Sequence, residues 1–228
     1  MAALAARHGL GEQATSALAA LLEGLAAEGD PPTSVREPTA ALEVHLADSL
    51  SGLEIESLRS AAAVADVGAG AGFPGLALAA ALPAARVDLI EATARKCAVI
   101  DRLASAAGLR NARAVAVRAE DWAAGAGAGA YDAVTARAVA PLAVLVEYAA
   151  PLLREGGALV AWKAGREPDE ERAGAGAASA LGLEVTAVRA VAPFADGRPR
   201  HLHVFAKVAP TPQRFPRRAG MARKRPLA

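Results

Sequence analysis

The chain has 228 residues, of which 54% are hydrophobic and only 4% aromatic, and its formal net charge is +1. This length suits one ordinary domain with an appendage, since domains commonly hold roughly 100 to 200 residues. The composition excludes a disordered chain, and its alanine bias favours helix. No stretch approaches the roughly 20 strongly apolar residues that span a bilayer, and the N-terminus does not read as a signal peptide. We therefore expect a cytoplasmic protein that does not enter the membrane.

Cysteine and histidine are too few for metal or disulfide chemistry. The one cysteine, Cys97, has no partner within the chain, and the four histidines show no metal-ligand spacing such as HExxH. Cys97 falls within a predicted helix, where a buried structural thiol is favoured over a reactive one. We expect no metal site.

Residues 1–60 are rich in alanine and leucine and predict a helical N-terminal cap. Two runs of apolar residues at helical spacing mark it: Leu18, Leu21, Leu22 and Leu25, then Leu42, Leu46, Leu50 and Leu53. Asp48 and Ser49 lie in the second run, where Asp48 either caps a helix or, with His45, serves the functional site.

From residue 61 onward, short apolar strands alternate with helical stretches. We expect strands at 62–68, 85–92, 112–122, 131–139, 158–165, 183–191 and 201–208, and helices at 73–83, 94–109, 141–157 and 167–181. This alternation predicts a doubly wound α/β domain with a parallel sheet covered on both faces. The domain would span residues 61–208, between the cap and a tail at 209–228.

The tail is basic. Seven lysines and arginines and no acid lie between Lys207 and Ala228. Such a segment indicates an anionic partner, with a merely solubilising end as the alternative.

The stretch "VADVGAGAGFPGLAL" places glycines directly after the first predicted strand. The first strand-to-helix turn of such a fold needs glycine where the backbone turns tightly or approaches a ligand, and Gly68, Gly70 and Gly72 occupy it. Gly70, Gly72 and Gly75 also match GxGxxG, a weak dinucleotide pattern. Asp66 favours another ligand, because a carboxylate there would oppose a pyrophosphate but suits the ammonium and sulfonium of S-adenosylmethionine.

Acidic residues also end the next two predicted strands. Glu91 lies where an acid accepts hydrogen bonds from the ribose hydroxyls of an adenosine, which holds for NAD as well. The third strand ends in "RAEDW", which puts Ala119 and Glu120 in the next loop, facing an adenine edge. We favour ligand contact over solvent-exposed acids at all three strand ends. Trp122 either stacks on a base or packs under its loop, and packing is favoured.

Several stretches together resemble a known family. They are "HLADSL", "DVGAGAGFPGLALA", "LIEATARKCAVIDRL", "GLRNARAVAVRAED", "YDAVTARAVAPL", "LLREGGALVAWKAG" and "RFPRRAG". In this order and spacing they resemble the RsmG (GidB) family, from about His45 to the C-terminus. The resemblance implies a Rossmann-like methyltransferase that transfers a methyl group from S-adenosylmethionine to N7 of a guanine in the decoding region of 16S rRNA. The segment before His45 lacks the family's Asn-Leu-Thr signature.

The resemblance also implies site residues. The positions that match the family's cofactor site are Asp66, Gly68, Gly70, Phe73, Glu91, Ala92, Thr93, Ala119, Glu120 and Arg137. We further expect RNA contacts from Arg137, Lys163, Arg214, Arg217 and Arg218. For Arg137 and Lys163 the alternative is a salt bridge at the end of the sheet.

The expected chemistry needs no general base, because guanine N7 carries a free lone pair and no proton. Positioning and a dry site would suffice, so we expect no catalytic residue in the acid–base sense. Two alternatives stay open, an NAD-dependent oxidoreductase and a nucleotide- or RNA-binding Rossmann protein without methyl transfer. The expected partner is 16S rRNA, either within the small ribosomal subunit or in an assembly intermediate, bound by a monomer.

Overall fold

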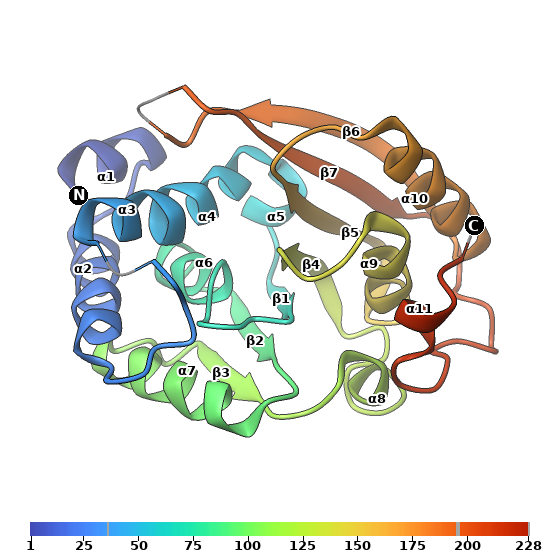
Figure 1. Ribbon diagram of the computed structural model, residues 1–228, viewed down its shortest axis with the longest axis horizontal. Helices are drawn as coiled ribbons and strands as arrows, with labels where there is room; N and C mark the ends of the chain where they lie inside the picture. Colours follow the sequence, from blue (N-terminus) through green and yellow to red (C-terminus); the bar gives the residue numbers. More distant parts are fainter. Residues whose placement is uncertain (36, 195–196, 228) are drawn as a thin grey trace.

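The computed structural model describes residues 1–35, 37–194 and 197–227. Within them, one sheet has seven strands in the order β3-β2-β1-β4-β5-β7-β6 (Figure 1). The strands are β1 (Ala63–Val67), β2 (Arg86–Ile90), β3 (Ala112–Val115), β4 (Tyr131–Arg137), β5 (Leu153–Lys163), β6 (Leu183–Val191) and β7 (Arg200–Lys207). The pairings from β3 to β5 are parallel, but β7 runs antiparallel to both of its neighbours. The sheet is therefore mixed, and the wholly parallel sheet expected from the sequence is wrong at this edge.

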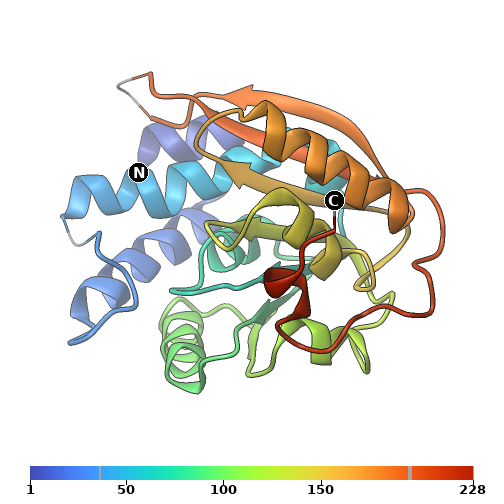
Figure 2. The same ribbon diagram turned by 45° about the vertical axis from the view of Figure 1, so that its right-hand side comes forward.

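Helices flank the sheet on both sides (Figures 1 and 2). They are α1 (Ala2–His8), α2 (Glu12–Ala27), α3 (Pro38–Ala41), the π-helical η1 (Leu42–Ala47), α4 (Asp48–Leu50), the 3₁₀ turn η2 (Ser51–Glu54), α5 (Glu56–Arg59), α6 (Gly75–Ala81), α7 (Ala94–Ala106), α8 (Ala119–Ala123), α9 (Leu142–Ala149), α10 (Pro168–Ala180) and α11 (Met221–Lys224). The described elements before β1 are all helices or helical turns, as the sequence predicted for this part of the chain.

The strand residues divide between two cores, one on each face of the sheet. Val64 and Val160 belong to one core, while their chain neighbours Ala65 and Leu159 belong to the other, as the alternation of side chains along a strand requires. The first core takes in Leu18 and the other buried leucines of the N-terminal helices together with α6 and α7, and the second takes in α8 to α11. The N-terminal helices thus share a core with the sheet.

Two boundaries differ from the sequence-based expectation. β3 ends at Val115, and the stretch predicted as its end forms α8, in which the Trp122 N–H donates to the Arg118 carbonyl. The helix expected over 141–157 ends at Ala149, and β5 begins at Leu153, beside Tyr131 of β4.

The strand order places a ligand site. From β1 the chain continues outward through β2 and β3, then returns to the other side of β1 with β4 and β5. At such a reversal the loops after the two central strands diverge, and a crevice opens beyond the carboxyl ends of the strands. The loops that follow β1, β2 and β4 meet at this edge.

Candidate functional site

The loop between β1 and α6 depends on glycine backbone geometry. Gly68, Gly70 and Gly72 have φ angles of 69°, 59° and 98°, in the region that other residues adopt only with strain. At Gly68 a side chain is also excluded by space, because a Cβ there would lie 2.7 Å from Val139 Cγ2. The loop after β1 therefore lies directly against the loop after β4.

The buried side chain of Asp66 supports the loop between β1 and α6. Its Oδ2 accepts from the Gly75 N–H at 2.9 Å, and its Oδ1 accepts from the Thr135 hydroxyl at 2.9 Å. Burial raises the pKa of Asp66 to about 6, which these hydrogen bonds and the charge of Arg137 oppose. The carboxylate joins β1, β4 and the start of α6, so it shapes the glycine loop without facing the pocket next to it.

Glu91, directly after β2, is held by both adjoining loops. Its Oε2 accepts from the Gly70 N–H at 3.2 Å, and its Oε1 accepts from the Thr93 N–H at 2.9 Å. Lys96 Nζ lies 3.9 Å from Oε2. A carboxylate fixed in this way is preorganised to accept hydrogen bonds from a ligand's hydroxyl groups.

These loops enclose a pocket of about 250 Å³, here called the β1–β2 pocket. It is lined by Val67, Gly68, Ile90, Glu91, Ala92, Lys96, Val117, Arg118, Ala119, Glu120, Ala138, Val139, Tyr148 and Arg223. Glu91 lies at the end of β2 and Glu120 in the first turn of α8, with backbone and apolar surface between them. Two carboxylate acceptors at the ends of a small, largely polar pocket suit a nucleoside, whose ribose hydroxyls and base both offer hydrogen-bond donors.

A larger pocket of about 800 Å³, the β4–β5 pocket, adjoins the first. Its lining consists of Asp48, Arg137, Ala138, Val139, Ala140, Pro141, Ala143, Trp162, Lys163, Ala164, Gly165, Glu167, Glu170, Ala173, Arg200, Pro226 and Leu227. Ala138 and Val139 line both pockets. Ala138 has a φ of 57°, a conformation that costs a non-glycine residue energy and is often found at functional sites. Ligands bound in the two pockets would therefore approach each other at Ala138 and Val139.

Comparisons with known proteins identify the family of this chain. The family model described as rRNA small subunit methyltransferase G matches residues 19–201. A ribosomal RNA small subunit methyltransferase G of Rubrobacter xylanophilus is 44% identical over 196 residues, which cover 84% of this chain and 75% of that protein. The chain belongs to this family. The family predicted from the sequence is therefore confirmed.

Solved structures confirm the Rossmann-like methyltransferase fold. The cofactor-bound protein Rv0187 from MTB superposes with a TM-score of 0.58 at 21% identity, covering 84% of this chain and 89% of the other. Aeropyrum pernix fibrillarin, solved with natively bound S-adenosyl-L-methionine, superposes with a TM-score of 0.54 at 18% identity, covering 70% of this chain and 73% of the other. Both likenesses concern the fold.

The structure sorts the cofactor positions implied by the family resemblance into two groups. Gly68, Glu91, Ala92, Ala119 and Glu120 line the β1–β2 pocket. The others lie behind or beside it: Asp66, Gly70 and Thr93 brace the loop and Glu91, Phe73 is buried, and Arg137 lines the β4–β5 pocket. Ala119 and Glu120 reach the pocket from α8, not from the loop that the sequence predicted, since the chain turns into a helix just after Arg118.

Phe73 links the glycine loop to the N-terminal helices. Its ring stacks on His45 with a centroid separation of 4.8 Å, and His45 Nε2 lies 3.2 Å from Thr33 Oγ1. Burial lowers the pKa of His45 to about 4, with a smaller contribution from the charge of Arg137, so the ring is neutral near pH 7. His45 and Phe73 fix the outer side of the loop.

Arg137 at the end of β4 is largely buried, and it pairs with Asp48 of α4. Its Nη1 donates to Asp48 Oδ2 at 3.0 Å and to the Val44 carbonyl at 2.8 Å. Asp48 therefore does not cap a helix through its side chain, and it lies on the wall of the β4–β5 pocket. Lys163 at the end of β5 also lines this pocket and pairs with Glu170 Oε1 at 2.6 Å. Both basic groups combine a salt bridge with a place at the pocket.

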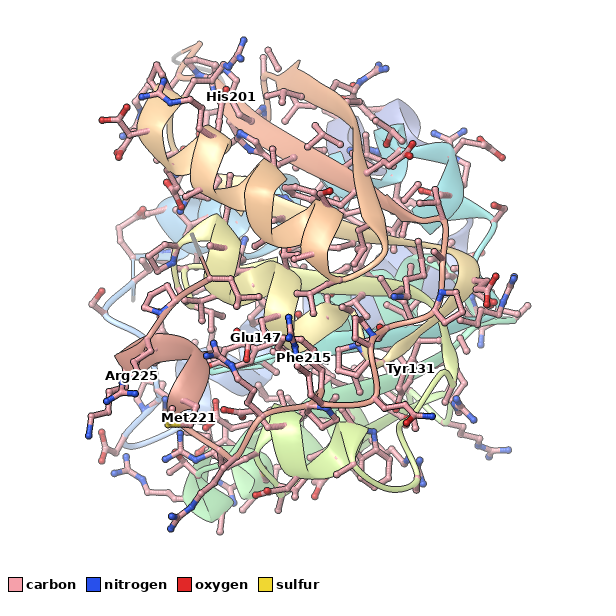
Figure 3. The ribbon with its side chains drawn as sticks, turned by 90° about the vertical axis from the view of Figure 1, so that its right-hand side faces the viewer. Tyr131, Glu147, His201, Phe215, Met221 and Arg225 are labelled. Carbon is pink, nitrogen blue, oxygen red and sulfur yellow. The ribbon has the colours of Figure 1, made fainter. Side chains whose placement is uncertain are left out.

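The basic tail is docked on the domain (Figure 3). Phe215 is buried, and Arg217 pairs with the buried Glu147 of α9 and donates to the Arg225 carbonyl at 2.8 Å. Arg214 lies over the Phe215 ring, 5.3 Å from its centroid, while Arg218 is exposed. Of the three tail arginines predicted to contact RNA, Arg217 is thus paired within the protein.

The last residues of the tail make contacts with both pockets that were not predicted from the sequence. The Gly220 N–H donates to Glu120 Oε1 at 2.8 Å, and Arg223 Nη2 donates to the Val139 carbonyl at 2.9 Å. Arg223 lines the β1–β2 pocket, and Pro226 and Leu227 line the β4–β5 pocket. The only sequence signal was the match of "RFPRRAG" to the family, which does not say where the segment lies.

Two kinds of feature are absent from the described residues, a metal-binding cluster and a helix able to cross a membrane. Among the described residues, no group of three or more histidines, cysteines and acids is placed to hold a metal ion. In the same part of the chain, no helix has the length and apolar character needed to cross a membrane. Cys97 is buried, and its thiol donates to the Glu91 carbonyl at 3.2 Å, which agrees with the structural role predicted for it.

Proposed function

We propose that this protein transfers the methyl group of S-adenosylmethionine to N7 of a guanine in 16S rRNA of the small ribosomal subunit. The enzyme class and the cofactor follow from family membership, as the sequence predicted. The observation that carries the proposal is the pair of adjoining pockets, of which the first suits a nucleoside cofactor and the second is roomy enough for an acceptor base.

The residues of the β1–β2 pocket fit S-adenosylmethionine. Glu91 is held by the N–H groups of Gly70 and Thr93 with acceptor capacity left for ribose hydroxyls. Ala119 and Glu120 would lie at the adenine, and the sulfonium end would lie near Ala138 and Val139, which this pocket shares with the β4–β5 pocket. When bound, the cofactor supplies a methyl group on a positively charged sulfur.

The transfer needs alignment and the exclusion of water. The guanine N7 lone pair forms a bond to the methyl carbon, the carbon–sulfur bond breaks, and its electron pair stays on sulfur. No proton leaves N7, so no base is required, and the protein contributes by holding the two reacting atoms in line. Ala138 and Val139, shared by both pockets, are the residues nearest to this junction.

The rim of the β4–β5 pocket can receive an RNA backbone. Lys163 and Arg200 line the pocket, and the exposed Arg214 and Arg218 lie on the tail segment that ends beside it. Cationic side chains around an acceptor pocket would bind phosphates and release counterions, so binding should weaken as salt rises. The expectation of a monomer remains a prediction.

Methyl transfer from labelled S-adenosylmethionine to small subunits from a strain lacking this gene tests the proposal directly. Label recovered as 7-methylguanosine supports it. Label in another nucleoside, or none, contradicts it. Calorimetry with S-adenosylhomocysteine and with NAD, run in parallel, separates a failed acceptor assignment from a failed cofactor assignment.

A further inference from the structure

One buried oxygen in the β4–β5 pocket has no hydrogen-bond donor. Asp48 Oδ1 accepts no hydrogen bond from the residues that the structure describes, although the Asp48 side chain is only 4% exposed. Its other oxygen, Oδ2, accepts from Arg137 at 3.0 Å. Buried acceptors are nearly always satisfied, so an exception on the wall of a pocket points to a donor supplied by a ligand.

Neighbouring side chains do not fill this role. Arg200 Nε lies 3.6 Å from Oδ1, close enough for an ion pair but too far for a hydrogen bond, and the Arg200 guanidinium also lies over the Phe194 ring at 4.8 Å from the centroid. The Asp48 backbone is fixed, because its carbonyl accepts from Trp162 Nε1 at 2.9 Å and from Ser51 Oγ at 2.6 Å. The carboxylate is therefore held in place, and its Oδ1 can still accept a hydrogen bond from a ligand.

Asp48 lies between two arginines, Arg137 and Arg200, whose charges favour its ionised form. Burial raises the pKa of Asp48, but the positive charges of Arg137 and Arg200 oppose that rise. An ionised carboxylate only accepts hydrogen bonds, and each oxygen has two lone pairs. The matching ligand edge is one that presents two adjacent donors to the carboxylate.

We propose, on the basis of the proposed function, that Asp48 binds the Watson–Crick edge of the acceptor guanine through N1–H and the exocyclic amino group. Guanine presents two adjacent donors on that edge, whereas adenine and cytosine present a ring-nitrogen acceptor beside their amino group and uracil flanks its N–H with carbonyls. N7 lies on the opposite side of the bicyclic ring. A guanine held at Asp48 keeps N7 free to face the wall that Ala138 and Val139 share with the β1–β2 pocket.

The test compares guanosine with inosine at the methylated position. Inosine lacks the exocyclic amino group but keeps N7, so the reacting atom stays in place. After wild-type enzyme has been used to map the 7-methylguanosine, small subunits are reconstituted from ligated 16S rRNA with either nucleoside there. The value of kcat/KM is measured for wild type, D48N and the control E167Q, which removes a charge from an exposed side chain in the same pocket. Calorimetry with S-adenosylhomocysteine and thermal melting accompany each variant.

We expect wild type and E167Q to prefer guanosine over inosine by about 10- to 100-fold, the range for a bidentate contact to a base. D48N should lose most activity on guanosine and discriminate less than about threefold, with unchanged binding of S-adenosylhomocysteine. Wild type methylating inosine as fast as guanosine overturns the assignment without any variant, as does D48N with full discrimination. Absence of 7-methylguanosine with wild type instead overturns the proposed function.

Discussion

The two pockets are assembled in different ways. The β1–β2 pocket consists largely of strand ends and the residues that directly follow them, such as Gly68 after β1 and Glu91 after β2. The β4–β5 pocket gathers residues that are far apart in the chain, among them Asp48, Arg137, Lys163 and Arg200. Local sequence motifs therefore predict the residues of the β1–β2 pocket, whereas the residues of the β4–β5 pocket are brought together only by tertiary packing. The C-terminal tail contacts both, through Arg223 in one and Leu227 in the other.

Detaching the tail should damage both pockets and give the largest loss of stability. Arg217→Ala leaves Glu147, whose side chain is only 3% exposed, without its partner. Removing one member of a buried pair costs about 3–5 kcal/mol, and the protein is expected to limit this cost by releasing the tail. Displacing Gly220 and Arg223 from the pocket should then weaken S-adenosylhomocysteine binding about tenfold, the value of one hydrogen bond to a charged group.

Urea unfolding and calorimetry check this prediction, with Arg218→Ala as the matched control. Arg218 is exposed on the same segment, so its loss should change the free energy of unfolding by less than about 0.5 kcal/mol. If the Arg217 and Arg218 variants bound S-adenosylhomocysteine equally well, the tail would not contribute to the cofactor pocket.

A second substitution should damage the β1–β2 pocket selectively. Gly68→Val adds strain at a φ of 69° and a clash with Val139 Cγ2, 2.7 Å from the Cβ position. Together these should lower the free energy of unfolding by about 2–4 kcal/mol and abolish measurable cofactor binding. Gly108→Ala, at a φ of 67° with open space around it, carries the backbone strain alone and should retain binding. Loss of binding in both variants would mean that proximity to Val139 is irrelevant.

The same contrast explains how far the sequence could predict the molecule. Glu91 was found because an acid at a strand end is visible in the sequence, and Glu120 was found although α8 replaced the expected strand end. The start of β5 was missed because the preceding residues are apolar and fit a helix. Within β5, the irregular pairing with β4 depends on Gly156, at a φ of 81°, and on Gly157, where a Cβ would lie 2.8 Å from the Asp132 carbonyl. The open oxygen of Asp48 results from contacts with β4 and β7, which no local pattern encodes.

The pH dependence of stability sharpens the role of Asp66 beneath the glycine loop. Its folded-state pKa of about 6 lies above the value of an unfolded aspartate, so the folded state holds a proton that the unfolded state releases. This contribution is fully present below about pH 4 and is lost as pH rises through 6, which amounts to about 2–3 kcal/mol. Urea unfolding from pH 4 to 7 should show this decline in wild type relative to Asp66→Asn.

His45 produces the opposite slope in the same range. Because its folded-state pKa is about 4, below the ordinary value, its contribution is present above pH 6.5 and is lost as pH falls through 4. The comparison with Asp66→Asn is therefore best made in a His45→Asn background, where the His45 slope no longer opposes the Asp66 slope. If the free energy of unfolding changed with pH in parallel for the His45→Asn variant and for the double variant that also carries Asp66→Asn, a raised pKa at Asp66 would be ruled out.

The smallest effect is expected for Lys163, which belongs to the β4–β5 pocket alone. Its ammonium pairs with Glu170, so a phosphate contact would replace part of an existing interaction, and the net gain from RNA is limited. Lys163→Ala should weaken small-subunit binding only about two- to fivefold and reduce the salt dependence by less than one phosphate contact. Arg172→Ala removes the same charge from an exposed pair with Asp169 outside both pockets and serves as the control. If small-subunit affinity fell equally steeply with salt concentration in the two variants, Lys163 would serve only the protein's own ion pair. A shallower fall for Lys163→Ala alone would place the RNA backbone at this pocket.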